Sequence, residues 1–188
     1  MTHTRRLTFL AILSALSFVL MYVSFPLIPG ASFLKLDFSV IPMLLALALF
    51  DFKSSVAVLF LRSLLKLILN NHGVETYIGL PMNIIALFLF LWAFAFIWKK
   101  RMRIEDYLKA TVLGTFVLTV AMVVLNLFYA MPLYAEFANF DIAKILGTSR
   151  YIVAMVVPFN IAEGVILALI FYIVYTSCKP FIERYQLK

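Results

Sequence analysis

Residues 78–98 read I-G-L-P-M-N-I-I-A-L-F-L-F-L-W-A-F-A-F-I-W, a nearly unbroken apolar run that contains no charged side chain. A helix rises about 1.5 Å per residue, so the run is long enough to cross the roughly 30 Å hydrocarbon core of a bilayer. Its apolar residues follow one another and do not alternate with polar ones, which argues against a strand of a membrane barrel. The run therefore predicts a membrane-spanning helix.

The whole chain has the same character. Of its 188 residues, 65% are hydrophobic and 19 are Phe, and the mean hydropathy is +1.05. A single soluble core of this size cannot bury so much apolar surface, so lipid is the expected solvent. Helices satisfy their own backbone hydrogen bonds in lipid. We expect an all-α integral membrane bundle, and the single cysteine, Cys178, excludes an internal disulfide.

Apolar windows predict six transmembrane helices, at residues 7–25, 39–50, 54–69, 78–98, 108–131 and 151–178. The first window follows Arg5 and Arg6 as in a signal peptide, but no small-residue cleavage site follows it. We therefore expect the first helix to be retained and residues 1–188 to form one transmembrane domain. An even number of spans places both termini on the same side of the membrane.

The net charge of +7 is concentrated beside the apolar runs, which favours membrane anchoring over nucleic-acid binding. Basic residues are enriched in cytoplasmic segments near the ends of spans. The sequence therefore predicts a multi-pass protein of the cell membrane with both termini cytoplasmic. The basic residues that carry this prediction are Arg5, Arg6, Lys53, Lys99, Lys100, Arg101, Arg103, Lys109, Lys179, Arg184 and Lys188.

The segment that follows the first helix, residues 26–37, is rich in Pro, Gly and large apolar residues, which predicts an ordered lid on the outer side. Residues 135–150 mix apolar and charged side chains, as in a short interfacial helix. Trp98 and Tyr151 stand near predicted helix ends, where aromatic belts form. Pro158 lies inside the last predicted helix and is expected to kink it.

Three amides, Asn83, Asn126 and Asn160, fall in the outer halves of predicted helices. Glu163 lies one turn from Asn160 on the same helix face, and Gly164 leaves room for a ligand or another helix. The amides could be glue between helices, at about 0.6 kcal/mol per hydrogen bond. Their shared depth beneath an apolar lid favours a pocket for a small molecule.

Arg62 and Lys66 lie four residues apart and share a face of the third predicted helix. Burying either cation without a partner costs at least about 2.5 kcal/mol. Two interpretations stay open: an ion pair with Glu163, or side chains that extend to the membrane interface.

Motifs for catalysis are missing from the sequence. No phosphate-binding loop and no H-E-x-x-H zinc motif occurs, and the Asp residues are scattered over different predicted loops. A membrane hydrolase or transferase needs such groups clustered around a metal or a nucleophile. We therefore expect a binding protein that is not an enzyme and that has no metal site and no catalytic cofactor.

Four motifs stand out along the chain. The first is A-I-L-S-A, in which Ala11 and Ala15 lie four residues apart. The others are F-L-K-L-D-F-S-V-I-P from residue 33, N-L-F-Y-A-M-P-L-Y from residue 126 and P-F-N-I-A-E-G from residue 158. In this order they resemble the riboflavin-binding S components of energy-coupling-factor (ECF) vitamin transporters, and Ala11 and Ala15 match the AxxxA motif of that family. At the position of Glu163 the family often has Lys, so this chain departs from the pattern there.

The resemblance implies a six-helix substrate-capture subunit that binds riboflavin from outside. Its partners would be a transmembrane T subunit, which docks on Ala11 and Ala15, and two cytoplasmic ATPases. Riboflavin would be a bound substrate and not a cofactor. The alternatives are an S component for another vitamin, or a small membrane enzyme or assembly factor. The expected ligand-binding residues are Leu36, Asp37, Phe38, Asn83, Asn126, Tyr129, Asn160 and Glu163.

Overall fold

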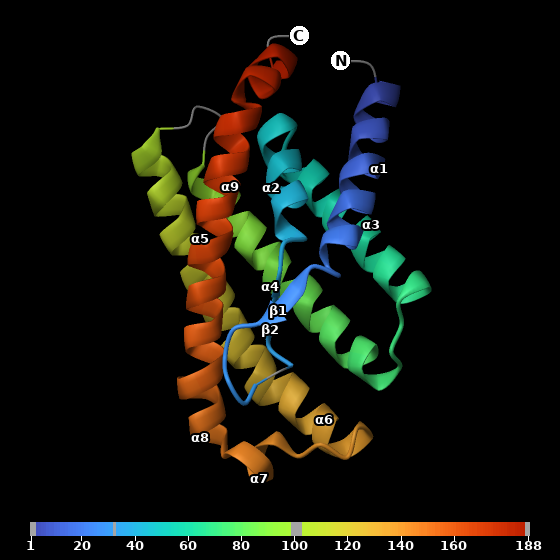
Figure 1. The fold of residues 1–188 in the computed structure, drawn as a ribbon, viewed down its shortest axis with the longest axis vertical. Helices are drawn as coiled ribbons and strands as arrows, with labels where there is room; N and C mark the ends of the chain where they lie inside the picture. The colour runs from blue at the N-terminus through green and yellow to red at the C-terminus, as the bar shows by residue number, and fades with distance from the viewer. Residues whose placement is uncertain (1–2, 32, 99–102, 187–188) are drawn as a thin grey trace.

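The computed structural model describes residues 3–31, 33–98 and 103–186 of the chain. It is an elongated helical bundle, with the N- and C-terminal ends together at one end (Figure 1). The described elements, in chain order, are α1 (His3–Leu20), β1 (Ser24–Pro26), β2 (Lys35–Asp37), α2 (Val40–Leu49), α3 (Phe52–Leu69), α4 (Val74–Ile97), α5 (Ile104–Leu125), η1 (Asn126–Ala130), α6 (Met131–Phe137), α7 (Ile142–Leu146), α8 (Thr148–Tyr151), η2 (Ile152–Val156) and α9 (Val157–Gln186).

Among the described residues, four helical stretches are long and apolar enough to cross a membrane: His3–Leu20, Val74–Ile97, Ile104–Phe137 and Thr148–Ile182. The predicted second and third spans differ from these. α2 has 10 residues, which at about 1.5 Å per residue reaches half-way through the hydrocarbon. α3 has 18 residues but carries Lys53, Arg62 and Lys66, which lower its hydropathy.

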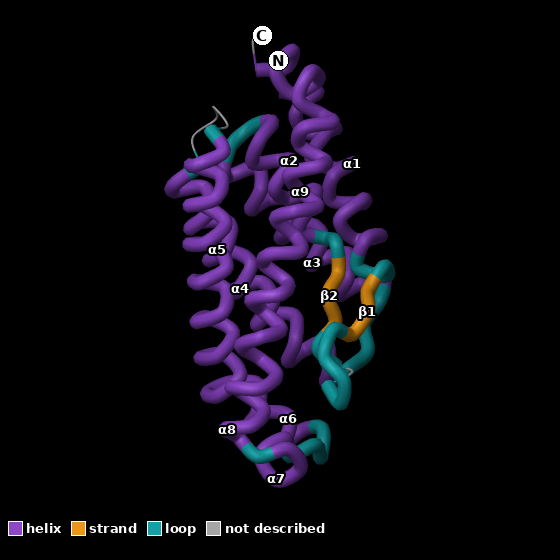
Figure 2. The backbone as a smooth tube through the Cα atoms, turned by 60° about the vertical axis from the view of Figure 1, so that its left-hand side comes forward, coloured by secondary structure: helices purple, strands orange, loops and turns teal. Residues whose placement is uncertain are grey.

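In its described residues, 26–31 and 33–37, the predicted lid is ordered, and it contains an element that the apolar pattern did not indicate; residue 32 lies outside the described residues. β1 and β2 pair as an antiparallel hairpin with Phe25 opposite Leu36, and the hairpin lies along one side of the bundle (Figure 2). The prediction that the first helix runs to residue 25 was therefore wrong, since α1 ends at Leu20 and Phe25 lies in a strand. Leu36 is fully buried, so the hairpin is anchored against the helices.

Two π-helical turns interrupt the long helices of the second half. η1 ends at Ala130 and η2 at Val156, each two residues before a proline, Pro132 or Pro158. Proline has no N–H to donate, so the helical hydrogen-bond ladder must shift in the turn before it. The disturbance expected at Pro158 therefore takes the form of a π-helical turn, and a second one occurs at Pro132.

Near the end where the termini lie, the core is aromatic. Trp98 is buried, and its ring lies 5.5 Å from Phe94, 5.8 Å from Phe171 and 5.6 Å from Tyr175, measured between ring centroids. The prediction that Trp98 belongs to an interfacial belt was wrong, because these rings enclose it within the bundle.

Gly164 of α9 leaves room for a helix, which is one of the two expectations for it. A Cβ atom at this position would lie only 2.2 Å from Oγ1 of Thr115 on α5. The absence of a side chain at Gly164 therefore lets α5 and α9 approach each other closely.

Some of the predicted basic residues lie outside the described residues: Lys99, Lys100 and Arg101, together with Lys188 at the C-terminal end.

Arg6 is described and forms an ion pair with Asp51, with 2.7 Å between the guanidinium nitrogen and a carboxylate oxygen. This pair joins α1 to the turn between α2 and α3 at the end of the bundle that holds the termini.

Candidate functional site

Asn126 stands at the junction of α5 and η1 and is almost completely buried. Its side-chain nitrogen donates a 2.7 Å hydrogen bond to the carbonyl of Met122, and its side-chain oxygen accepts a 2.6 Å hydrogen bond from the hydroxyl of Tyr151. A carboxamide has two N–H donors and two oxygen lone pairs. Among the described residues, one donor and one lone pair of Asn126 therefore have no partner and are available to a ligand.

Asn160 is fully buried on α9, one turn before Gly164. Its side-chain nitrogen donates a 2.7 Å hydrogen bond to the carbonyl of Val156. Its side-chain oxygen is buried and accepts no hydrogen bond from any residue that the structure describes. A buried acceptor without a donor costs about 1 to 3 kcal/mol, so a ligand that donates a hydrogen bond here would relieve that cost.

The lid packs directly over these amide-bearing segments. Leu36 and Leu34 share a buried apolar cluster with Tyr151, Met155 and Phe159. Phe33, in the loop of the hairpin, lies half exposed with its ring 5.9 Å from that of Tyr151. This lid cluster joins the hairpin to the segment that leads into Asn160.

Asn83 is the third predicted amide, and it belongs to a different set of contacts. Its side-chain oxygen accepts a 2.8 Å hydrogen bond from Arg62 on α3, and another guanidinium nitrogen of Arg62 lies 3.1 Å from the sulfur of Met21. Arg62 is completely buried. It therefore follows neither open interpretation: it does not extend to an interface, and its hydrogen-bond partners are Asn83 and Met21, not Glu163.

Asp37 connects the two groups of residues. It ends β2, and its carboxylate accepts a 2.8 Å hydrogen bond from the backbone N–H of Ser39. Asp37 lies close enough to both Arg62 and Glu163 to act on them electrostatically. The lid thus places one carboxylate near both the buried cation and the carboxyl group of α9.

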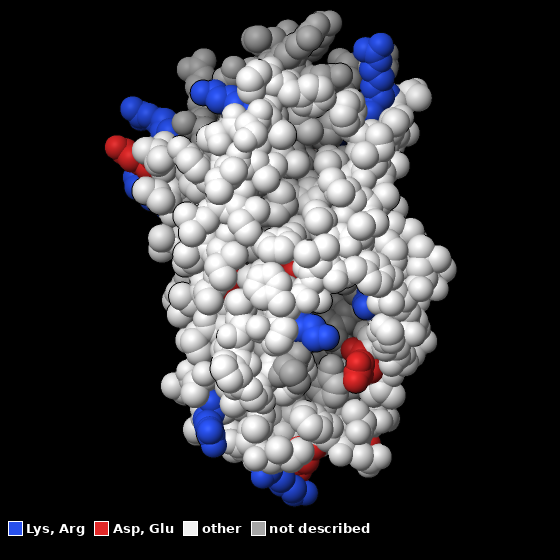
Figure 3. Space-filling view, in the orientation of Figure 1, with Lys and Arg blue, Asp and Glu red and all other residues white. Residues whose placement is uncertain are grey.

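Lys66 lies close enough to Arg62 and Asp37 for their charges to act on it. Its ammonium group contacts the side-chain oxygen of Asn70. Lys35 and Glu75 are also close enough to act on it electrostatically. Figure 3 shows this half of the molecule hollowed, with basic and acidic side chains around the hollow. Charged side chains therefore surround the opening of this hollow.

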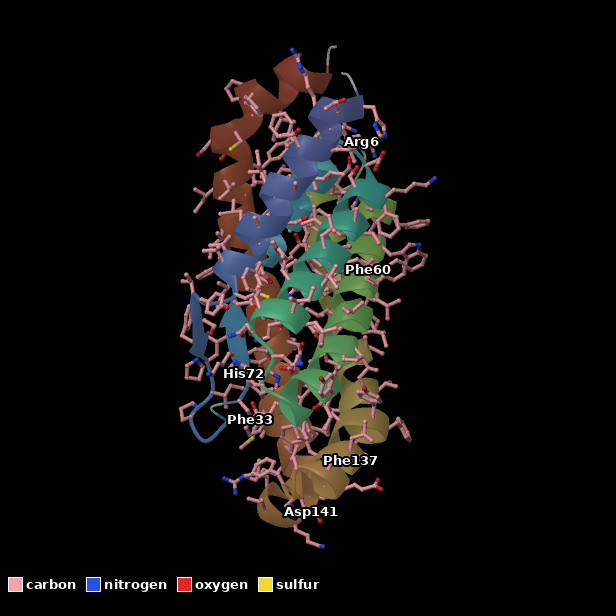
Figure 4. All side chains as sticks on the ribbon, turned by 90° about the vertical axis from the view of Figure 1, so that its right-hand side faces the viewer. Arg6, Phe33, Phe60, His72, Phe137 and Asp141 are labelled. Carbon is pink, nitrogen blue, oxygen red and sulfur yellow. The ribbon has the colours of Figure 1, made fainter. Side chains whose placement is uncertain are left out.

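The two predicted aromatic ligand residues, Phe38 and Tyr129, lie in different parts of the core. Phe38 is half-buried and packs against both large core clusters. Tyr129 packs instead with Ile78 and Met82 on the α4 side of the bundle, in a different cluster from Leu36. Figure 4 places Phe33 in the half of the bundle that ends at Asp141, away from Arg6. Of the three predicted apolar or aromatic ligand residues, Leu36 and Phe38 therefore pack in the lid cluster and Tyr129 does not.

Ala11 and Ala15, the predicted docking residues, are both exposed on α1. The opposite face of this helix is buried through Leu10, Leu13 and Ser17. The small side chains therefore lie on a face of α1 that the rest of the described chain leaves uncovered.

Sequence reasoning missed two residues that the structure ties to the site. Tyr151 was expected in an interfacial belt but is 2% exposed and bonded to Asn126, so that prediction was wrong. Met21 follows the first helix and contacts Arg62. The position of Tyr151 nine residues before Asn160 carried no signal of this role, because its partner lies 25 residues away on another helix.

Comparison with known proteins defines the class. A family model described as the substrate-specific component of ECF transporters matches residues 5–175. A solved structure, the S component of a bacterial ECF transporter, superposes with a TM-score of 0.75 at 29% identity, covering 96% of this chain and 99% of that one. The chain belongs to this family. It is the substrate-binding S subunit of an ECF transporter, a multi-pass membrane protein and not an enzyme.

Three curated relatives are similar to this chain over nearly its whole length. The riboflavin transporter RibU of Streptococcus thermophilus is 57% identical over 184 residues, which cover 98% of this chain and 87% of that protein. RibU of Lactococcus lactis subsp. cremoris is 37% identical over 196 residues, which cover 95% of each protein. The riboflavin transporter FmnP of Bacillus subtilis is 28% identical over 180 residues, 96% of this chain and 95% of its own length. The family resemblance expected from the sequence motifs is thus confirmed.

Proposed function

We propose that this S subunit captures riboflavin at the outer side of the cell membrane and delivers it for ATP-driven uptake. The observation that carries the proposal is the pair of buried amides, Asn126 and Asn160, each with unused hydrogen-bonding groups beneath an apolar lid. Relatives that cover nearly the whole chain are named riboflavin transporters, which supports this substrate over another vitamin.

Riboflavin matches the chemistry of these side chains. Its ring system is a flat apolar slab, which suits the lid cluster of Leu36, Met155 and Phe159. One edge of the ring carries alternating acceptors and an N–H donor. The free oxygen of Asn160 can accept from that donor, and the spare N–H of Asn126 can donate to a ring carbonyl. Asn83, Glu163, Asp37 and Phe38 lie at the margin, and Tyr129 is retained as a stacking candidate.

The proposed topology has six spans within one domain, residues 1–188, and both termini in the cytoplasm. The location of the described termini at one end of the bundle supports it (Figure 1), and so does the basic character of the segments at that end. The lid and the amides then belong to the outer half, where a substrate arrives. α2 and α3 would complete the six helices as short segments that tilt little or do not span the membrane fully.

Transport would require a transmembrane T subunit and two cytoplasmic ATPases. The exposed stripe of Ala11 and Ala15 supports docking through α1, since small side chains let another helix approach closely. Replacing both alanines with Leu is expected to abolish uptake and leave riboflavin binding unchanged. Loss of binding by this variant, with uptake reduced only in proportion, would contradict a docking role.

The substrate is tested on the detergent-purified chain. Bound flavin gives the protein a yellow colour and the visible absorption band of a flavin, whereas a different vitamin would not give this band.

Asn126→Ala and Asn160→Ala are each expected to raise the dissociation constant for riboflavin about 5- to 150-fold. This range corresponds to about 1 to 3 kcal/mol per lost hydrogen bond in a water-poor site. The matched control is Asn71→Ala, which removes an exposed amide that bonds only within its own turn region.

Two outcomes separate the proposal from purely structural amides. Amides that only join helices would lower the melting temperature and leave the dissociation constant within about twofold of the wild type. If both variants fold and behave in this way, the riboflavin site lies elsewhere in the chain.

A further inference from the structure

Tyr151 is a buried phenol that ends α8, immediately before the π-helical turn η2. It is 2% exposed, and its hydroxyl donates a 2.6 Å hydrogen bond to the side-chain oxygen of Asn126. The two residues come from different helical segments, on either side of the α6–α7 connection. This hydrogen bond therefore ties the α9 side of the bundle to an amide of the proposed riboflavin site.

The hydrogen bond restrains the direction of that amide. The terminal torsion of an Asn side chain is broad, so one contact at its nitrogen leaves the carboxamide free to swing. Met122 holds the nitrogen of Asn126 through its carbonyl, and Tyr151 holds the oxygen. With both ends held, the remaining N–H of Asn126 keeps one direction, and a ligand acceptor finds it already oriented.

The ring of Tyr151 has a separate set of contacts. It lies 5.9 Å from the ring of Phe33 in the lid loop and packs in the lid cluster with Leu36. These contacts involve ring carbons and not the hydroxyl. Tyr151→Phe therefore removes the hydrogen bond to Asn126 and leaves the lid packing in place.

We propose that Tyr151 is a positioning residue for substrate recognition: its hydroxyl orients the carboxamide of Asn126, which in turn contacts the substrate. This inference rests on the proposed riboflavin site. It adds Tyr151 as a residue that does not contact the substrate itself. Tyr151 instead fixes the orientation of Asn126, which does contact the substrate.

The first measurement is the dissociation constant of riboflavin for Tyr151→Phe, from flavin fluorescence quenching on the purified full chain. Loss of one orienting hydrogen bond is expected to raise it about 2- to 12-fold, the equivalent of about 0.5 to 1.5 kcal/mol. The matched control is Tyr107→Phe. Tyr107 is equally buried and donates a 2.5 Å hydrogen bond to the carbonyl of Ala168, in the aromatic core, and its variant is expected to bind as the wild type does.

A double-mutant cycle with Asn126→Ala distinguishes positioning from a structural role. If Tyr151 acts through Asn126, then Tyr151→Phe has no further effect on the dissociation constant once Asn126 is Ala. An equal fold-loss in both backgrounds would show that the hydroxyl only supports the bundle, and would overturn the proposal. The titration reports on the folded fraction of each variant, so a reduced yield of folded protein does not change the comparison.

The same cycle separates this inference from the riboflavin site on which it rests. Weak binding by Asn126→Ala together with wild-type binding by Tyr151→Phe would refute the positioning role and leave the site standing. Wild-type binding by Asn126→Ala would refute its contact with riboflavin and the role of Tyr151 with it, and the site as a whole would be refuted only if Asn160→Ala also bound as the wild type does.

Discussion

A methyl group added at Gly164 would collide with Thr115 on the facing helix α5. The new Cβ would lie 2.2 Å from Oγ1, 2.5 Å from Cγ2 and 2.8 Å from Cβ of Thr115. A comfortable contact needs about 3.5 Å or more, so α5 and α9 must separate by roughly an ångström. Overpacking of this kind costs about 1 to 3 kcal/mol, and we expect Gly164→Ala to lower the melting temperature of the purified protein by roughly 2 to 12 °C.

Two other helical glycines provide controls for the same substitution. A Cβ at Gly79 of α4 would meet only the hydroxyl of Tyr134, at 3.9 Å, which is an ordinary contact. Gly79→Ala is therefore expected to raise stability slightly, by up to about 1 kcal/mol, because alanine favours the helix. At Gly114 the nearest atom is a Phe90 ring carbon at 3.0 Å, so Gly114→Ala is expected to fall between the other two variants.

Rescue identifies the cause of the Gly164 effect. Thr115→Ala removes Oγ1 and Cγ2, the two nearest atoms, and is expected to recover most of the stability that Gly164→Ala loses. Gly164→Ala is also expected to weaken riboflavin binding, because Asn160 and Glu163 lie within a turn of Gly164 on α9, and Thr115→Ala should restore that binding. A melting temperature for Gly164→Ala equal to that of Gly79→Ala would refute the close approach of α5 and α9.

The remaining predictions concern charged side chains. The N-cap of α3, Asp51, is partly buried, which by itself would raise its pKa, but hydrogen bonds from Ser54 and Arg6 outweigh this and lower the pKa from 3.8. Its charge therefore stabilises the protein above about pH 4, by about 0.2 to 1 kcal/mol for so exposed a pair, and this contribution disappears as the pH falls through the lowered pKa. The melting-temperature difference between the wild type and Asp51→Asn should be constant above about pH 5 and should shrink in more acidic buffer; a difference that grows in acid would reverse the assignment. Arg62→Met should cost about 1 to 3 kcal/mol by leaving Asn83 without its donor, and adding Asn83→Leu should restore much of it; additive losses would mean that the two residues are not coupled.

Sequence alone was sufficient for the class of fold. The apolar run at residues 78–98 became α4 (Val74–Ile97), and the run at 151–178 became the core of the last long helix, because a continuous apolar stretch can only be satisfied as a helix in lipid. The motif at residue 33 together with those at residues 126 and 158 was sufficient for the family, since local residue order carries that information. The lid was recognisable as ordered because a solvated loop has no need for so many large apolar residues.

Tertiary structure decided which partner each polar group received. Arg62 could have met Glu163 or the membrane interface, and only the packing of α3 against α4 directed it to Asn83. Tyr151 looked like a belt residue because it stands near a predicted helix end, and only the folded structure brings its partner, Asn126, beside it. Periodicity and hydropathy indicate which face of a helix is apolar. Hydrogen bonds between distant segments depend instead on how the helices cross. The crossings arise from contacts such as that of Gly164 with Thr115.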